Sequence, residues 1–127
     1  MDRRFWVGIA ILVCFLVLGL FIAAGMRSIH TPIAEKLQLA ADRASAGELY
    51  QATQLANRAK NDWQRHWQVT AAVADHEPME QIDGLFAQLS GFAATGDAGS
   101  FSAVSGRLSR LVEAIGDAHA LTWWNLL

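Results

Sequence analysis

The hydrophobic pattern of the chain changes after its first 27 residues. From Phe5 to Gly25 the chain runs for 21 residues without a charged side chain. As a helix, at about 1.5 Å per residue, this run is about 32 Å long, close to the thickness of the hydrocarbon core of a bilayer. We therefore predict a transmembrane anchor in residues 1–27, which contacts the lipid bilayer through Phe5–Gly25, and a separate domain in residues 28–127.

In residues 28–127 apolar side chains recur at steps of three and four, the spacing of one face of an α-helix. No segment alternates apolar and polar residues with the period of a β-strand. The expected fold is all-α, an N-terminal transmembrane helix followed by a four-helix antiparallel bundle made of two helical hairpins. The four helices are expected at about residues 32–46, 48–75, 78–96 and 98–119.

The apolar stripes of these helices define the expected core. Gly47 and Gly96 follow the ends of two stripes, as glycines often do at helix C-termini. The residues expected to face inward include Ile33, Leu37, Ala52, Ala56, Ala59, Trp63, Met79, Ile82, Leu85, Phe86, Leu89, Phe101, Val104, Leu108, Leu111, Val112 and Ile115.

Two prolines mark expected helix starts. Residues 28–31 form a polar exit from the anchor, and Thr31 before Pro32 is typical of an N-cap followed by the first helical residue. We therefore expect the anchor and the next helix to be separate. Pro78 is expected to start the third helix of the bundle in the same way, which leaves His76 outside that helix.

The last predicted helix is followed by an apolar segment. Either Asp97 or Ser100 caps this helix, which we expect to end near residues 116–119. Residues 120–127, with the sequence ALTWWNLL, are then expected to pack back on the bundle, because an exposed apolar end would favour aggregation.

The second predicted helix has the most regular apolar stripe in the chain. Trp63 and Trp67 lie one turn apart on it, and His66 follows Asp62 by one turn. We interpret the tryptophans as the wide end of the core, with the C-terminal segment packed over this helix, and His66 as half-buried and hydrogen-bonded. The alternative is an aromatic pocket or a partner-binding patch. If a partner surface exists, its expected residues are Trp63, Trp67, Asp75, His76, Trp123 and Trp124.

An acidic cluster lies at the start of the third predicted helix. His76, Glu80 and Asp83 are spaced at i, i+4 and i+7, and Asp75 precedes them. On one helix face such residues would suit a divalent metal, so a metal- or ligand-sensing domain is one alternative function. Because Pro78 is expected to place His76 outside the helix, we predict no metal site.

Charge is distributed unevenly along the chain. There are 10 Lys and Arg and 12 Asp and Glu residues in total, and residues 1–27 are net positive, so the predicted domain is acidic. An acidic domain is a poor binder of nucleic acid. Arg3 and Arg4 concentrate positive charge before the apolar run. This favours a single-pass protein of the cell membrane, with its N-terminus inside and the bundle domain outside the cytoplasm.

No residue pattern indicates catalysis. The only cysteine, Cys14, lies inside the apolar run, and the chain has no Gly-x-Ser-x-Gly motif and no glycine-rich phosphate-binding motif. The carboxylates form no pair in an apolar setting. We predict a protein that is not an enzyme, with no catalytic residue and no cofactor.

The apolar run also has one feature of a signal peptide. Ala23 and Gly25 are small residues placed as at a cleavage site, so a secreted helical domain released after Gly25 is a further alternative. The apolar core is longer than the 7–15 residues usual in signal peptides, which favours an uncleaved anchor.

Several segments together resemble a known family. The anchor, Trp63 with Trp67, the segment Asp75–Asp83 (DHEPMEQID) and the ending Trp123–Leu127 (WWNLL) are similar to the bacterial family catalogued as domain of unknown function 4363. The resemblance implies a small membrane-anchored helical protein without an assigned activity, cofactor or site residue. The leading hypothesis is a non-enzymatic interaction or scaffold module at the cell envelope, which binds a protein partner.

Overall fold

The chain folds into helices alone over the residues that the structure describes. This computed structural model describes residues 2–74 and 76–125, and gives only the backbone of residues 73 and 118–125. No residue in these ranges lies in a β-strand, so the all-α prediction is confirmed. The helices are α1 (Arg3–Ser45), α2 (Leu49–Arg65), α3 (Trp67–Val73), α4 (His76–Thr95) and α5 (Ala98–Asn125).

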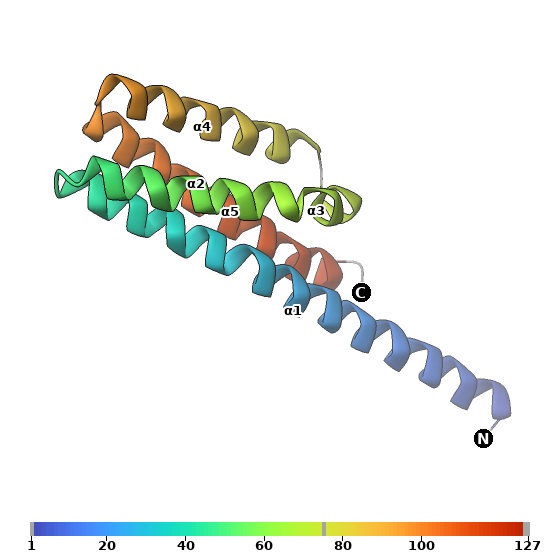
Figure 1. Cartoon of the computed structure of the whole chain (residues 1–127). Coiled ribbons are helices and arrows are strands. Elements are labelled where there is room, and N and C mark those ends of the chain that lie inside the picture. The colour runs from blue at the N-terminus through green and yellow to red at the C-terminus, as the bar shows by residue number, and fades with distance from the viewer. Residues whose placement is uncertain (1, 75, 126–127) are drawn as a thin grey trace.

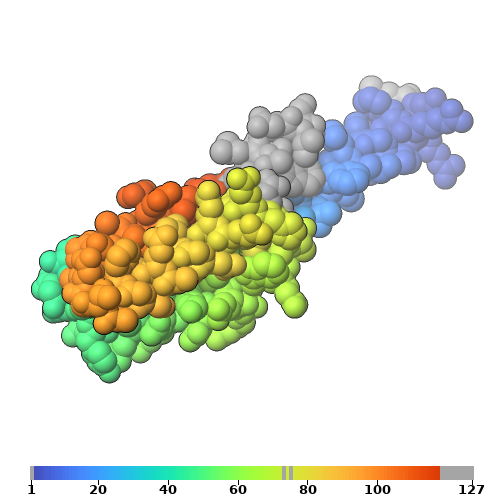
Figure 2. All heavy atoms as spheres, turned by 90° about the horizontal axis from the view of Figure 1, so that it is seen from above, coloured from blue at the N-terminus to red at the C-terminus, as the bar shows by residue number. Residues whose placement is uncertain are grey.

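Four antiparallel rods form the bundle (Figure 1). α1 pairs with α2 and α4 pairs with α5, so both predicted helical hairpins are present. α2 and α3 together make one rod, and α5 packs along α1 more extensively than any other pair of helices. The N-terminal part of α1 projects beyond the packed helices, as Figure 2 also shows from above.

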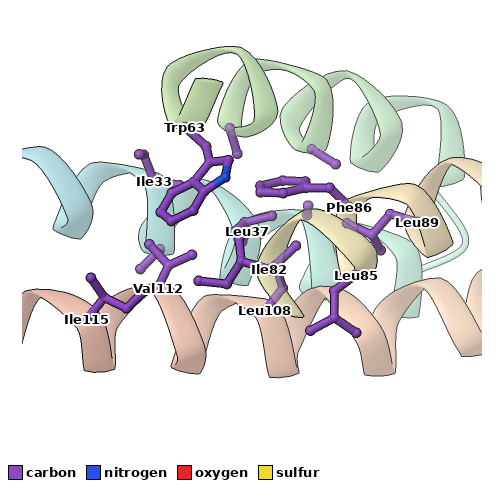
Figure 3. Close-up of a cluster of buried hydrophobic side chains, with 14 of the residues drawn as sticks. Ile33, Leu37, Trp63, Ile82, Leu85, Phe86, Leu89, Leu108, Val112 and Ile115 are labelled. Atoms are coloured by element: carbon purple, nitrogen blue, oxygen red, sulfur yellow. The ribbon is translucent and has the colours of Figure 1, made fainter. Parts of the chain in front are cut away.

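Most of the side chains that the helical spacing predicts lie in the core (Figure 3), which also contains Met26 and Ala34. Side chains from α1, α2, α4 and α5 point into one interior, where Trp63 and Phe86 lie above Leu37 and Ile82. Burial of each large apolar side chain stabilises the fold by about 1.5–3 kcal/mol. The largest fully buried apolar residues are Trp63, Phe101, Ile33, Leu37, Met79, Ile82, Leu108 and Val112.

α1 is one continuous helix, so the predicted break at residues 28–31 is wrong. Pro32 lies inside it and lacks the N–H that would bond the carbonyl oxygen of Ser28. Both residues are exposed, so water can reach that carbonyl group. Met26 and His30 before the proline and Ile33 after it are buried in one stripe. Packing on both sides of Pro32 therefore holds the helix together. The division into an anchor and a domain after residue 27 stays a prediction.

Small residues bring α5 close to α1. Ser102, Ser105 and Ser109 lie at steps of three and four on α5, and their hydroxyl groups donate to backbone carbonyl oxygens of α1 at 2.9, 2.6 and 2.6 Å. Serine, alanine and glycine allow such close approach of two helices. The carbonyl groups that accept these hydrogen bonds belong, in the same order, to Ala41, Leu37 and Ala34.

α5 continues to Asn125, so the predicted helix end near residues 116–119 is wrong. Gly116 lies where α5 touches α1, and a Cβ atom on it would be 3.4 Å from the Cβ of His30. This glycine therefore permits close packing and does not end the helix. The backbone of residues 120–125 also continues the helix, contrary to the expectation that it turns back on the bundle. Residues 126–127 lie outside the described part of the chain.

The second predicted helix is divided at His66 into α2 and α3. The Nδ1–H of His66 donates to the carbonyl oxygen of Asp62 at 2.9 Å, and the hydroxyl of Thr70 donates to the carbonyl oxygen of His66 at 3.0 Å. The same two carbonyl oxygens also accept the backbone N–H groups of His66 and Thr70, so hydrogen bonds continue across the break. His66 is half-buried and hydrogen-bonded, as predicted.

α4 begins at His76, two residues before its predicted start. Pro78 is its third residue, a position in the first turn where no intrahelical N–H bond is required. The expectation that His76 lies outside the helix is therefore wrong. The other end is as predicted, since Gly96 follows α4 with a φ of 72° and Gly47 follows α1 with a φ of 83°.

Asp97, and not Ser100, caps α5. The Oδ1 of Asp97 accepts the backbone N–H of Ser100 at 3.1 Å. Hydrogen bonds from the side chain and the backbone of Ser100 hold the pKa of the Asp97 carboxyl group below its ordinary value of 3.8.

We expect the substitution Asp97→Ala to destabilise the protein at neutral pH and to have less effect in acid. Because the folded-state pKa is lowered, the contribution of the carboxylate is present above about 3.8, and it is lost as the pH falls through the folded-state pKa. Urea unfolding of both proteins at neutral pH and at several acidic pH values measures this. The two unfolding midpoints should converge as the pH is lowered, and a separation that stays constant would contradict a charged cap.

Candidate functional site

Trp63, Trp67 and Asp83 form a hydrogen-bonded cluster between two rods of the bundle. Trp63 lies in the last turn of α2, Trp67 is the first residue of α3, and Asp83 lies in the second turn of α4. The Nε1–H of Trp63 donates to Oδ1 of Asp83 at 2.8 Å, and the Nε1–H of Trp67 donates to Oδ2 at 3.3 Å. One carboxylate thus joins α4 to both halves of the divided rod.

The two tryptophans differ in exposure. Trp63 is 1% exposed, and Figure 3 shows its ring reaching from α2 toward α1. The ring meets the imidazole of His30 edge to face, with 6.0 Å between the ring centroids. Trp67 is half-buried. Trp63 is therefore a core residue, as interpreted from the sequence, and only Trp67 offers an accessible indole face.

A surface hollow lies beside this cluster. Its volume is about 440 Å³, and it opens between α2 and α4 next to the Trp67 indole. Lys60 and Gln64 supply polar groups on the α2 side. The residues that line the hollow are Lys60, Trp63, Gln64, Trp67, Asp83, Phe86 and Ala87.

The cluster holds α4 to the divided rod of α2 and α3 through side-chain hydrogen bonds. Each oxygen of Asp83 already accepts an indole N–H, so this carboxylate is engaged as a clamp. Among the described residues, no group of three or more His, Cys, Asp or Glu side chains is placed to hold a metal ion. His76 and Glu80 are exposed, and Asp75 lies outside the described residues. Nothing in the described geometry favours the metal-sensing alternative.

The residues of the predicted partner surface are only partly brought together. Trp63 and Trp67 share one acceptor, and His76 is exposed at the start of α4. Trp123 and Trp124 lie in the last turns of α5, and their side chains are outside the described part of the structure. α5 packs mainly on α1 and α4. The predicted packing of the C-terminal segment over the second helix is therefore wrong.

The sequence pattern did not single out His30, which is 1% exposed. Its Nδ1–H donates to the carbonyl oxygen of Met26 at 2.7 Å, and its Nε2 lies 3.4 Å from the hydroxyl of Thr70. His30 thus links α1 to α3 beside Trp63. The missed signal is the spacing of Met26, His30 and Ile33, which is helical once the helix is allowed to continue through Pro32.

We expect Asp83→Ala to lower the free energy of unfolding by about 1–3 kcal/mol, because the buried indole N–H of Trp63 loses its acceptor. Asp83→Asn retains one side-chain oxygen and should cost less. Both Glu80 and Asp83 are exposed, so Glu80→Ala is the matched control that removes a carboxylate of the same helix away from the two indoles, and it should change stability by less than about 0.5 kcal/mol. Urea unfolding followed by tryptophan fluorescence measures all three. Equal effects at Asp83 and Glu80 would contradict the clamp.

Comparison with known proteins identifies the family of the chain. A family model described as a domain of unknown function (DUF4363) matches residues 21–126. The match covers the bundle and the last residues of the apolar run. No curated protein and no solved structure matches the chain. The chain therefore belongs to the DUF4363 family, as its tryptophans and its Asp75–Asp83 segment predicted.

Proposed function

We propose that this protein is a single-pass, non-enzymatic interaction or scaffold module of the cell envelope. In this proposal its N-terminus is inside and its bundle lies outside the cytoplasm. The proposal rests mainly on the exposed apolar surface of the N-terminal half of α1. Among the described helices, α1 is long and apolar enough to cross a membrane. Its large apolar side chains are exposed there, from Phe5 at 53% to Phe21 at 79%. Water is a poor solvent for such a surface, and lipid is a good one.

The continuity of α1 supports a scaffold role. No turn separates the apolar part from the packed part, where Gly19 is the first buried residue and Met26 the first residue of the hydrophobic core. Ser45 lies 20 residues after Gly25, which is a rise of about 30 Å along the helix. The bundle would therefore stand on a stiff rod, with the turns at Gly47 and Gly96 about 30 Å from the lipid. A stiff rod presents a partner surface at a fixed height and angle.

The hollow beside Trp67 is where we expect a protein partner to bind. It combines a half-buried indole, an apolar base and the amine of Lys60 within one surface. Aromatic side chains in such partly enclosed positions are common anchors of protein interfaces. Asp83 accepts a hydrogen bond from each indole, which holds the Trp67 ring in place beside the hollow.

Release by cleavage is the second candidate, because one feature of the fold is compatible with it. Cleavage after Gly25 would leave every buried residue from Met26 onward in place. The bundle would then remain whole as a secreted domain. The mass of the mature protein decides between the two, since the anchored form retains residues 1–25.

Labelling with a membrane-impermeant maleimide tests the proposed topology. In a Cys14→Ser background, Tyr50→Cys places a thiol at a residue that is 76% exposed, at the far end of the bundle. Asp2→Cys is the matched control before the apolar run, since it keeps both Arg3 and Arg4. We expect intact cells to label at position 50 and not at position 2, and lysed cells to label at both. Labelling at position 50 only after lysis would place the bundle in the cytoplasm and overturn the proposed orientation.

A further inference from the structure

The register of α5 on α1 is set by contacts along the whole bundle. Ser109 lies level with Ala34, as its hydroxyl bonds that residue's carbonyl oxygen. Toward the apolar part of α1, Gly116 packs against His30, and the Nε of Arg27 lies 3.5 Å from Oδ1 of Asp117. The two helices therefore run antiparallel and in step as far as Arg27.

The same register places the end of α5 beside the apolar run of α1. Fourteen residues beyond Ser109 is Trp123, and fourteen residues before Ala34 is Leu20. Both helices rise about 21 Å over that distance. Residues 118–125 of α5 thus lie level with about residues 18–25 of α1.

The exposure of α1 at this level agrees with a neighbouring helix. Gly19 is buried and Ala23 is half-buried, and both lie on the face of α1 that carries Met26, since they precede it by seven and three residues. Leu20 and Phe21 point away from that face and are 65% and 79% exposed. At the level of residues 19–25, one face of α1 is covered and the others are open.

The charged parts of α1 and α5 stop at the same level of the bundle, and the apolar parts of both helices begin there. Arg27 is the first charged residue after the run that begins at Phe5, and Asp117 is the last charged residue of the sequence. Their ion pair therefore marks a line across both helices. On one side of the line the bundle is charged, and on the other side neither helix carries Asp, Glu, Lys or Arg until Arg4.

We propose that the last two turns of α5, residues 118–125, enter the leaflet through which α1 leaves the membrane, with Trp123 and Trp124 at the boundary between headgroups and acyl chains. This inference rests on the proposed membrane anchoring. Trp123 lies level with Leu20, five residues or about 8 Å inside Gly25. Tryptophan is enriched at that boundary, and interfacial helices lie about 5–10 Å deep. Lipid would then cover the apolar end of α5, which explains why that end does not have to fold back.

Nitroxide labels on the full chain in vesicles of phosphatidylethanolamine and phosphatidylglycerol test the proposal. Oxygen concentrates in lipid and a nickel chelate stays in water, so their collision rates with a label report its depth. One sample carries the label on the native Cys14, in the apolar run. In a Cys14→Ser background, single cysteines at Ala120, Leu121 and Thr122 cover most of one helical turn, so one faces away from α1. Glu113→Cys is the matched control on the charged part of α5, where the side chain is exposed.

We expect the label at Cys14 and at least one label at positions 120–122 to collide several-fold less often with the nickel chelate, and more often with oxygen, than the label at position 113. If Cys14 is in lipid but positions 120–122 behave like position 113, the anchor stands and this inference is overturned. If the label at Cys14 itself is accessible to the chelate, the proposed membrane anchoring is wrong. The inference about α5 is then wrong as well, because it depends on that anchoring. The circular dichroism spectrum of each labelled protein shows that its helices are intact.

Discussion

Replacing Trp63 with alanine is expected to lower the free energy of unfolding by about 3–5 kcal/mol, the range observed when a buried aromatic side chain is removed. The side chain is 1% exposed and fills the space between α1, α2 and α4. The substitution leaves a cavity, and it also removes the edge-to-face contact with His30 and the hydrogen bond to Asp83. The free energy of unfolding of a domain is typically about 5–15 kcal/mol, so this loss is a large part of it. The variant should therefore unfold at a clearly lower temperature than the original protein.

Trp67→Ala is the matched control for this prediction. Trp67 is one turn further along and donates to the same carboxylate, but it is only half-buried and its hydrogen bond is longer. We expect a loss of about 1–2 kcal/mol. Unfolding of the full chain in detergent micelles, followed by circular dichroism, compares the two. If both substitutions cost the same, the division into a core tryptophan and a surface tryptophan is wrong.

The helices and the core could be predicted from the sequence because both depend on local spacing. The stripe that contains Ala52, Ala56, Ala59 and Trp63 follows the helical period, and all four residues are buried. The turn at Gly47 could be predicted for the same reason. Its positive φ is a conformation that glycine adopts without strain, so the residue type alone indicates the helix end.

Two of the wrong helix boundaries share one physical cause. Pro32 and Gly116 are residues that local rules place at helix ends, yet both lie inside long helices. Near each of them α1 packs against α5, through the buried stripe at Met26 and His30 in one case and the close approach to His30 in the other. Contacts between residues far apart in the sequence outweigh the local preference, and a single sequence does not show which residues meet.

The candidate site was predictable in its aromatic residues and not in its polar partner. Trp63 and Trp67 are evident one turn apart on a stripe. Asp83 lies 20 residues after Trp63, and its role depends on how α4 turns beside α2. On the sequence alone it belongs to an acidic helix start, which suggested a metal. The serines that join α5 to α1 are a signal that was present, because Ser102, Ser105 and Ser109 share the helical spacing of the core.

Placing two arginines in the apolar run is expected to remove the protein from the membrane. Val13 and Val17 lie one turn apart near its centre and are 50% and 56% exposed, outside the packed bundle. Each arginine near the centre of a membrane-spanning helix costs about 2.5–3.5 kcal/mol, so Val13→Arg with Val17→Arg should disfavour insertion by about 5–7 kcal/mol. The apolar side chains of the run favour insertion by only about 0.3–0.6 kcal/mol each, so the two arginines offset most of their combined contribution. The bundle should still fold, because the core residues begin at Met26.

The control adds the same two charges to the bundle surface, as Gln51→Arg with Asn61→Arg on exposed positions of α2. After an alkaline carbonate wash and centrifugation, the control should remain in the membrane pellet and the variant with arginines in the apolar run should move to the supernatant. A variant that stays in the pellet as fully as the control would show that residues 5–25 are not what holds the protein to lipid. Retention of a smaller but clear fraction is the result expected if the end of α5 also binds the bilayer, because a second, shorter apolar helix would then contribute part of the affinity.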